Sequence, residues 1–181
     1  MVIKKVVDKK KPEPSGSRNS KLRSFESYER ASGTSYSWTV RTRGRDRSEA
    51  VAYARNQAFT VCGQASFKEA DLHPCAVEYL LGALGGDLLT GFAVIAARRE
   101  IQLHDTEVSI SGCLNNPLVF LGVIGEKGHP GFEKITGTLY VCADAEASTL
   151  RQIWEEVLTQ SPLVNTLQRA VNLALELQIT V

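Results

Sequence analysis

The sequence has no excess of charge, no closely spaced cysteine pair and few histidines. Its 181 residues carry a net charge of +1, and 43% of them are hydrophobic. Proteins that attach to nucleic acid or to acidic membrane surfaces through their charge need a clear positive excess, so we expect neither partner. The chain is long and apolar enough for one domain with its own core.

The cysteines are spread along the chain without a CxxC spacing: Cys62, Cys75, Cys113 and Cys142. A chain that can build a hydrophobic core does not need a disulfide framework, so we expect reduced thiols in a cytoplasmic protein. The three histidines show no metal-ligand spacing to any cysteine. We therefore expect no metal site and no cofactor.

The first 32 residues are polar and rich in lysine, proline, serine and glycine, and we interpret them as an arm ahead of a domain at 33–181. Lysines cluster near the start, but no apolar stretch typical of secretory signals follows them, so we expect no signal peptide. One hypothesis is that residues 1–20 recruit a partner, which would give the protein a structural or interaction role.

Residues 80–97 form an apolar stretch that raises the possibility of a membrane span. Asp87 lies near its middle, where a charge is costly in lipid. The stretch follows Asp71-Leu72-His73-Pro74, a helix-start signal with a proline near the first turn. We therefore predict a helix over about 75–99 that is buried on most faces in the core of a soluble domain, with no membrane partner.

Apolar and polar residues alternate in several further segments, as in half-buried strands. The predicted strands are 35–41, 50–55, 59–61, 107–114, 135–142 and 171–181, with a turn at 43–46 and a loop at 122–131. An amphipathic helix follows Asp144, and Ser161-Pro162 begins a shorter helix with serine as its N-cap. The order βββ-α-ββ-α-α-β predicts an α+β domain with largely antiparallel strands.

Two motifs at a wide separation carry a resemblance to a known family. The first runs from Pro74 to Asp87, Pro-Cys-Ala-Val-Glu-Tyr-Leu-Leu-Gly-Ala-Leu-Gly-Gly-Asp, and is similar to a run that ends in cysteine in that family. The second is Ser161-Pro162 with Thr166-Leu167, similar to Cys-Pro-Val followed by Thr-Leu. With the element order, they resemble the OsmC/Ohr family of osmotically induced and organic hydroperoxide resistance proteins, over about residues 35–181.

The resemblance implies the OsmC-like fold, a peroxide stress context and an intertwined homodimer with its site at the interface. In the family, one cysteine attacks a peroxide with help from an arginine and a glutamate, and a second cysteine resolves the sulfenic acid. Asp87 and Ser161 stand at those two positions here. Because the attack needs a thiolate, the resemblance does not carry the peroxidase mechanism over to this chain.

Asp87 is the most informative residue, because a buried carboxylate without a partner is costly or binds a proton. It is either a ligand-binding or catalytic group in a remodelled pocket, or one half of a structural ion pair. The candidate partners for such an ion pair are Arg41, Arg43 and Arg55. Both interpretations remain open from the sequence.

Three further residues each have a functional and a structural interpretation. Glu78 has the spacing of the family's glutamate, but a first-turn carboxylate also suits the helix dipole. Cys75, roughly 18 Å from Asp87 along a helix, is a candidate relocated nucleophile or an inert core residue. Ser161 would need an adjacent base to act as a nucleophile, whereas helix capping accounts for it.

We favour an OsmC-like homodimer that lacks the usual thiol pair. Its interface pocket, lined by Asp87, would bind a small apolar or peroxide-like molecule or be vestigial. The alternative is a thiol-dependent organic hydroperoxide reductase that uses Cys75.

Overall fold

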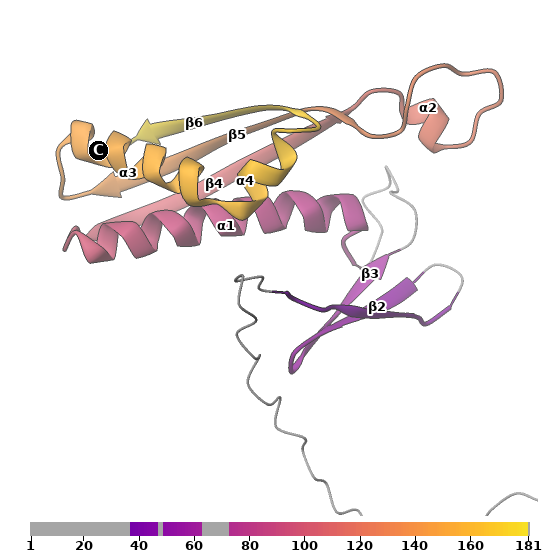
Figure 1. Ribbon diagram of the computed structural model, residues 1–181, viewed down its shortest axis with the longest axis horizontal. Helices are drawn as coiled ribbons and strands as arrows, with labels where there is room; N and C mark the ends of the chain where they lie inside the picture. Colours follow the sequence, from indigo (N-terminus) through magenta and orange to yellow (C-terminus); the bar gives the residue numbers. More distant parts are fainter. Residues whose placement is uncertain (1–36, 47–48, 63–72, 181) are drawn as a thin grey trace, which may run out of the picture. The chain divides into compact units, whose positions relative to one another are not determined.

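The computed structural model describes residues 37–46, 49–62 and 73–180. In chain order its elements are β1 (Arg41–Gly44), β2 (Glu49–Ala54), β3 (Gln57–Cys62), α1 (Ala76–Arg98), β4 (Leu103–Leu114), α2 (Pro117–Phe120), β5 (Phe132–Ala143), α3 (Ala147–Gln160), α4 (Pro162–Leu167) and β6 (Asn172–Ile179) (Figure 1). The predicted α+β class and element order are confirmed, with α2 in addition. The predicted arm at 1–32 lies outside the described residues.

The added helix α2 has the same start signal as α4. Asn116 is its N-cap, and the side chain of Asn116 accepts a hydrogen bond from the Leu118 amide at 2.9 Å. Pro117 then occupies the first turn, where a missing N–H costs nothing. The sequence therefore contained the signal for α2, in the segment just before the predicted loop.

The strands form two three-stranded sheets. One is the antiparallel meander β1-β2-β3, as predicted. In the other, β4 runs antiparallel to β5, whereas β5 runs parallel to β6. A parallel neighbour requires a crossover connection, and α3 and α4 supply it between β5 and β6. The prediction of largely antiparallel pairing holds, with this one parallel pair.

The predicted first strand was wrong in position. Residues 37–40 are not in a strand, and β1 occupies part of the segment predicted as a turn. Trp38 is 86% exposed and Val40 is 54% exposed, so the apolar alternation there does not mark a face buried in the described chain. β1 is instead defined by its pairing with β2, and all four of its residues are exposed.

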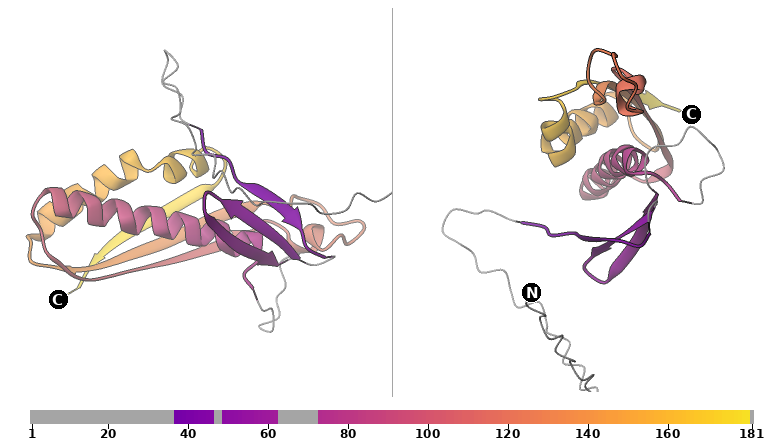
Figure 2. Two further views of the ribbon diagram at one scale, coloured as in Figure 1. Left: turned by 90° about the horizontal axis from the view of Figure 1, so that it is seen from below. Right: turned by 90° about the vertical axis from the view of Figure 1, so that its right-hand side faces the viewer.

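The hydrophobic core lies between α1, α3 and the sheet β4-β5-β6. Both helices cover the same face of this sheet (Figures 1 and 2). The predicted apolar face of α3 is confirmed, since its Leu150, Ile153, Trp154 and Val157 are all buried. Burying each such side chain stabilises the fold by about 1.5–3 kcal/mol. The fully buried side chains are Phe92, Leu84, Leu88, Ile135, Leu139, Leu150, Ile153 and Val141.

Only one face of α1 is buried, which corrects the expectation that most faces would be. Leu84, Leu88 and Phe92 point into the core, whereas Leu80 and Val94 are exposed. The sheet and α3 cover only one side of α1. Part of the apolar surface of α1 therefore stays exposed in the described chain. By length and composition α1 would be able to cross a membrane, and in this fold it is the central core helix.

We expect Leu88→Ala to lower the free energy of unfolding by about 2–5 kcal/mol, because it leaves a cavity in a fully buried site. Leu118→Ala in α2 is the matched control, because Leu118 is 43% exposed, and its effect should stay within about 1 kcal/mol. Urea unfolding followed by circular dichroism measures both. Equal losses would contradict the burial of Leu88 in the core.

Candidate functional site

The structure brings Asp87 and Ser161 together, although they lie 74 residues apart in the sequence. The Ser161 hydroxyl donates a hydrogen bond of 2.5 Å to Oδ2 of Asp87. Asp87 lies in the middle of α1, and Ser161 lies between α3 and α4. The two positions at which the resemblance places the family's cysteines therefore hold a carboxylate and a hydroxyl in direct contact.

The predicted N-cap role of Ser161 is confirmed. Its Oγ accepts a hydrogen bond of 2.9 Å from the Val164 amide, while its backbone amide donates to the Val157 carbonyl at 2.8 Å. Ser161 thus ends α3, begins α4 and binds α1. Its side chain is buried, with 5% exposed, and its only hydroxyl proton points to Asp87. Both the donor and the acceptor function of the Ser161 hydroxyl are thus used within the fold, which supports its structural interpretation.

The three arginines proposed as partners of Asp87 lie elsewhere in the described chain. Arg41 stacks over the Tyr53 ring, with its guanidinium carbon 5.5 Å from the ring centroid. Arg43 is in β1, and Arg55 occupies the turn between β2 and β3 with a φ of 54°. Within the described residues, the structure records no ion pair between any of them and Asp87, whose carboxylate binds Ser161 instead.

A pocket of about 250 Å³ lies next to the Asp87–Ser161 pair. It extends over roughly three turns of α1, about 16 Å from Asp87 to Arg98 at the standard helix rise. Val94, Ile95 and Val157 give it an apolar wall, and Val94 lies on the exposed face of the helix. The lining residues are Asp87, Thr90, Gly91, Val94, Ile95, Arg98, Val157, Gln160, Ser161 and Pro162.

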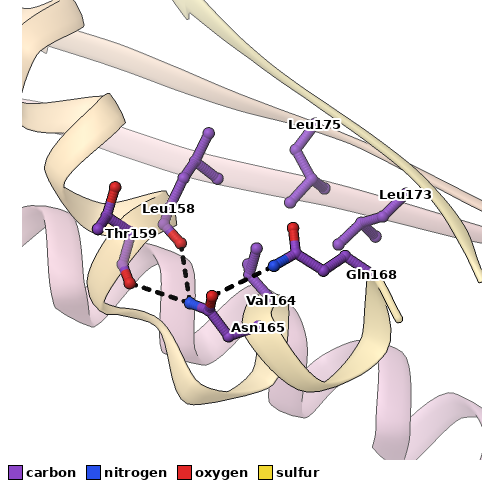
Figure 3. A pocket seen from close by; sticks show the side chains of 7 residues that line it. All are labelled: Leu158, Thr159, Val164, Asn165, Gln168, Leu173 and Leu175. Carbon is purple, nitrogen blue, oxygen red and sulfur yellow. Dashed lines mark hydrogen bonds between the residues drawn. The ribbon is translucent and has the colours of Figure 1, made fainter. Parts of the chain in front are cut away.

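A second pocket, of about 360 Å³, lies between the α3–α4 connection and β6 (Figure 3). Both polar atoms of the side chain of Asn165, which lines this pocket, form hydrogen bonds within the fold. Asn165 Nδ2 donates to the carbonyls of Leu158, Thr159 and Ser161 at 3.3, 3.0 and 2.7 Å, and its Oδ1 accepts from Gln168. Asn165 therefore holds the turn that carries Ser161, and this pocket offers few free polar groups to a ligand.

Glu78 belongs to the start of α1, roughly 13 Å along the helix from Asp87. Its Oε2 accepts a hydrogen bond of 2.7 Å from the backbone amide of Cys75. This bond, with a smaller contribution from the Cys75 thiol, holds the pKa of Glu78 below its usual value of 4.5. The two residues form a capping box, so the geometry supports the structural interpretation of Glu78.

Cys75 is the N-cap of α1 and is buried, with 7% exposed. Sequence reasoning missed its neighbour Cys62, at the end of β3, which pairs with it in an isolated β-bridge. Neither local spacing nor periodicity signals this contact, because it depends on how β3 meets the helix. Among the described residues, no group of three or more histidine, cysteine or acidic side chains could hold a metal ion.

Comparison with known families identifies the fold and its relatives. A sequence model described as OsmC-like protein matches residues 68–176. The chain belongs to the OsmC-like protein family. It is thereby related to the organic hydroperoxide resistance proteins, as the two motifs had indicated. A search of curated protein sequences gave no match.

Several solved structures share the fold at low sequence identity. The OsmC-like protein of Mycoplasma pneumoniae has a TM-score of 0.68 and 15% identity, over 82% of this chain and 100% of its own. A hypothetical protein from Aquifex aeolicus has a TM-score of 0.64 and 14% identity, over 81% and 98%. The organic hydroperoxide resistance protein OhrB of Bacillus subtilis has a TM-score of 0.54 and 16% identity, over 79% and 98%.

We expect Ser161→Ala to lower the free energy of unfolding by about 1–3 kcal/mol, because it removes a helix cap and leaves Asp87 without its donor. Asp87→Ala and the double variant complete a thermodynamic cycle in urea. The coupling free energy between Asp87 and Ser161 should exceed about 0.5 kcal/mol. Thr90→Ala is the control, because its hydroxyl bonds within α1, and it should be additive with Ser161→Ala.

We expect Glu78→Gln to lower the melting temperature near neutral pH. The difference in melting temperature between the variant and the wild type should disappear in acid. Because the folded-state pKa lies below 4.5, ionised Glu78 contributes stability at pH values above 4.5. That contribution is lost as the pH falls through the folded-state pKa. Thermal unfolding across this range tests it, with Glu155→Gln on α3 as control. A gap that does not change with pH would contradict the capping role.

Proposed function

We propose that this OsmC-like protein binds a small molecule in the pocket beside Asp87 and Ser161, as a cytoplasmic homodimer, and does not use the thiol couple of the peroxidases. The observation that supports this is the Asp87–Ser161 hydrogen bond in the pocket wall. Neither a carboxylate nor a hydroxyl has an accessible sulfenic-acid state. The pair recognises a ligand by hydrogen bonding and leaves it unchanged.

The chemistry of the wall indicates the kind of ligand. A carboxyl group has several acceptor sites, and Ser161 occupies one of those on Asp87. A ligand with one hydrogen-bond donor therefore fits there, with its carbon skeleton against Val94, Ile95 and Val157. At about 250 Å³ the pocket is smaller than most sites for drug-sized molecules. Organic hydroperoxides and the corresponding alcohols meet both requirements.

The exposed apolar face of α1 supports the homodimer. Leu80 and Val94 are 37% and 50% exposed, on a helix whose other face forms the core. Val94 also lines the pocket, so the pocket borders this face. A second copy of the chain covering the face would enclose the pocket and bury apolar surface that is costly to leave in water.

Binding of cumyl alcohol, the reduced product of an aromatic hydroperoxide, tests the proposal without oxidising any cysteine. We expect the wild type to bind it in ligand-observed NMR titrations. Asp87→Ala should weaken binding about tenfold, because the hydrogen-bond acceptor for the ligand is lost. Asp105→Ala removes an exposed carboxylate from β4 and should leave binding unchanged.

The dimer is tested separately by light scattering. The wild type should have twice the mass of one chain. The Val94→Arg variant should have the mass of a single chain. Absence of binding at millimolar alcohol, with the dimer intact, would mean that the site is vestigial and would end the ligand proposal. A monomeric wild type that still binds the alcohol would end the interface proposal alone.

A further inference from the structure

Two cysteines outside the Asp87 pocket are neighbours in space. Cys62 is the last residue of β3, and Cys75 is the N-cap of α1. They pair in an isolated parallel β-bridge, and the Cys62 amide donates to the Pro74 carbonyl at 3.0 Å. Both are free thiols.

The bridge gives the two residues a spacing suited to a disulfide. Paired residues in neighbouring strands lie about 4.8 Å apart and direct their side chains to the same side. Disulfides join residues whose Cα atoms are about 4.4–6.8 Å apart. The general spacing of bridged residues therefore falls within the range in which a disulfide between Cys62 and Cys75 can form.

Contacts on either side of the bridge hold the two cysteines in place. The Tyr79 hydroxyl, in the first turn of α1, donates to the Thr60 carbonyl in β3 at 2.7 Å. The rings of Tyr79 and Phe59 lie 5.1 Å apart between centroids. Glu78 fixes the Cys75 amide at 2.7 Å. The end of β3 is thus attached to the start of α1 by side chains as well as by backbone.

We propose that Cys62 and Cys75 form a dithiol that a hydroperoxide converts to an intramolecular disulfide. Cys62 is half-buried and Cys75 is buried, so the peroxide reaches Cys62 first. The Cys62 thiolate attacks the terminal peroxide oxygen, the O–O bond breaks, and the alkoxide takes a proton and leaves as alcohol. This step produces a sulfenic acid on Cys62.

Cys75 completes the reaction. Its sulfur attacks the sulfur of the Cys62 sulfenic acid, the S–O bond breaks, and hydroxide leaves with the thiol proton as water. In total the two thiols lose two electrons and two protons, and the peroxide is reduced to alcohol and water. The reaction is independent of ligand binding at Asp87, since the two sites are roughly 18 Å apart along α1.

The other two cysteines lack such a partner. Across the β4–β5 ladder, Cys113 faces Lys134 and Cys142 faces Asp105. Cys113 is exposed, so a peroxide oxidises it without forming an internal disulfide. The Cys113→Ser, Cys142→Ser double variant removes both groups and retains the proposed dithiol, which makes it the reference protein for the test.

The experiment treats this reference protein with one equivalent of cumene hydroperoxide. We expect the loss of both free thiols, the loss of two hydrogens from the intact mass, and a Cys62–Cys75 crosslinked peptide after proteolysis without reductant. Dithiothreitol should restore both thiols. Adding Cys75→Ser should stop the disulfide and leave a Cys62 sulfenic acid that dimedone labels.

Adding Cys62→Ser to the reference protein gives the second arm, in case the change at the Cys75 helix cap prevents folding. It should leave Cys75 mostly reduced, because Cys75 is buried, and should slow thiol loss at least tenfold. The proposal is overturned if both thiols of the folded reference protein survive the peroxide. It is equally overturned if the products are crosslinks between chains, or if Cys75 oxidises as fast without Cys62.

Discussion

The close packing of one face of α1 on the sheet β4-β5-β6 is the contact from which the other elements take their positions. A Cβ atom at Gly85 would lie 3.1 Å from Val108 Cγ1 in β4, so even an alanine there would require the Val108 side chain to shift by a few tenths of an ångström. Leu84 and Leu88 are fully buried beside it. With this face fixed, the helical repeat places Asp87 at the edge of the buried face, within reach of Ser161.

The same helix carries two kinds of chemistry at different points along its length. Its N-cap residue Cys75 lies beside Cys62 of β3, and Asp87 in its middle lies beside Ser161. Sulfur can change its oxidation state and oxygen in these groups cannot. The proposed ligand recognition and the proposed thiol oxidation therefore lie at separate places along α1.

The parts of the fold that were predictable from sequence depend on local chemistry. The serine–proline signal at Ser161 placed α4 correctly, because capping and the missing proline N–H act within one turn. The clear alternation of the last strand placed β6, whose Leu173, Leu175 and Leu177 pack on the core. The long apolar run located α1 to within one residue at each end.

The parts that were not predictable depend on residues distant in sequence. Trp38 and Val40 have the pattern of a strand, but pairing with β2 begins only at Arg41. The charge of Asp87 and the arginine of the resembled family predict an arginine partner, whereas the described structure brings Ser161 to Asp87 from the connection between α3 and α4. The Cys62–Cys75 contact likewise depends on where β3 ends against α1, and no spacing rule gives that position.

The contact between Asp87 and Ser161 also restricts which substitutions the fold tolerates at these two positions. A single exchange at position 161 to an apolar residue takes the hydrogen-bond donor away from a half-buried carboxylate, which costs about 1–3 kcal/mol. A cysteine there offers only a weak donor. A substitution at only one of the two positions therefore gives a less stable protein, so the side chains at 87 and 161 have to be exchanged together.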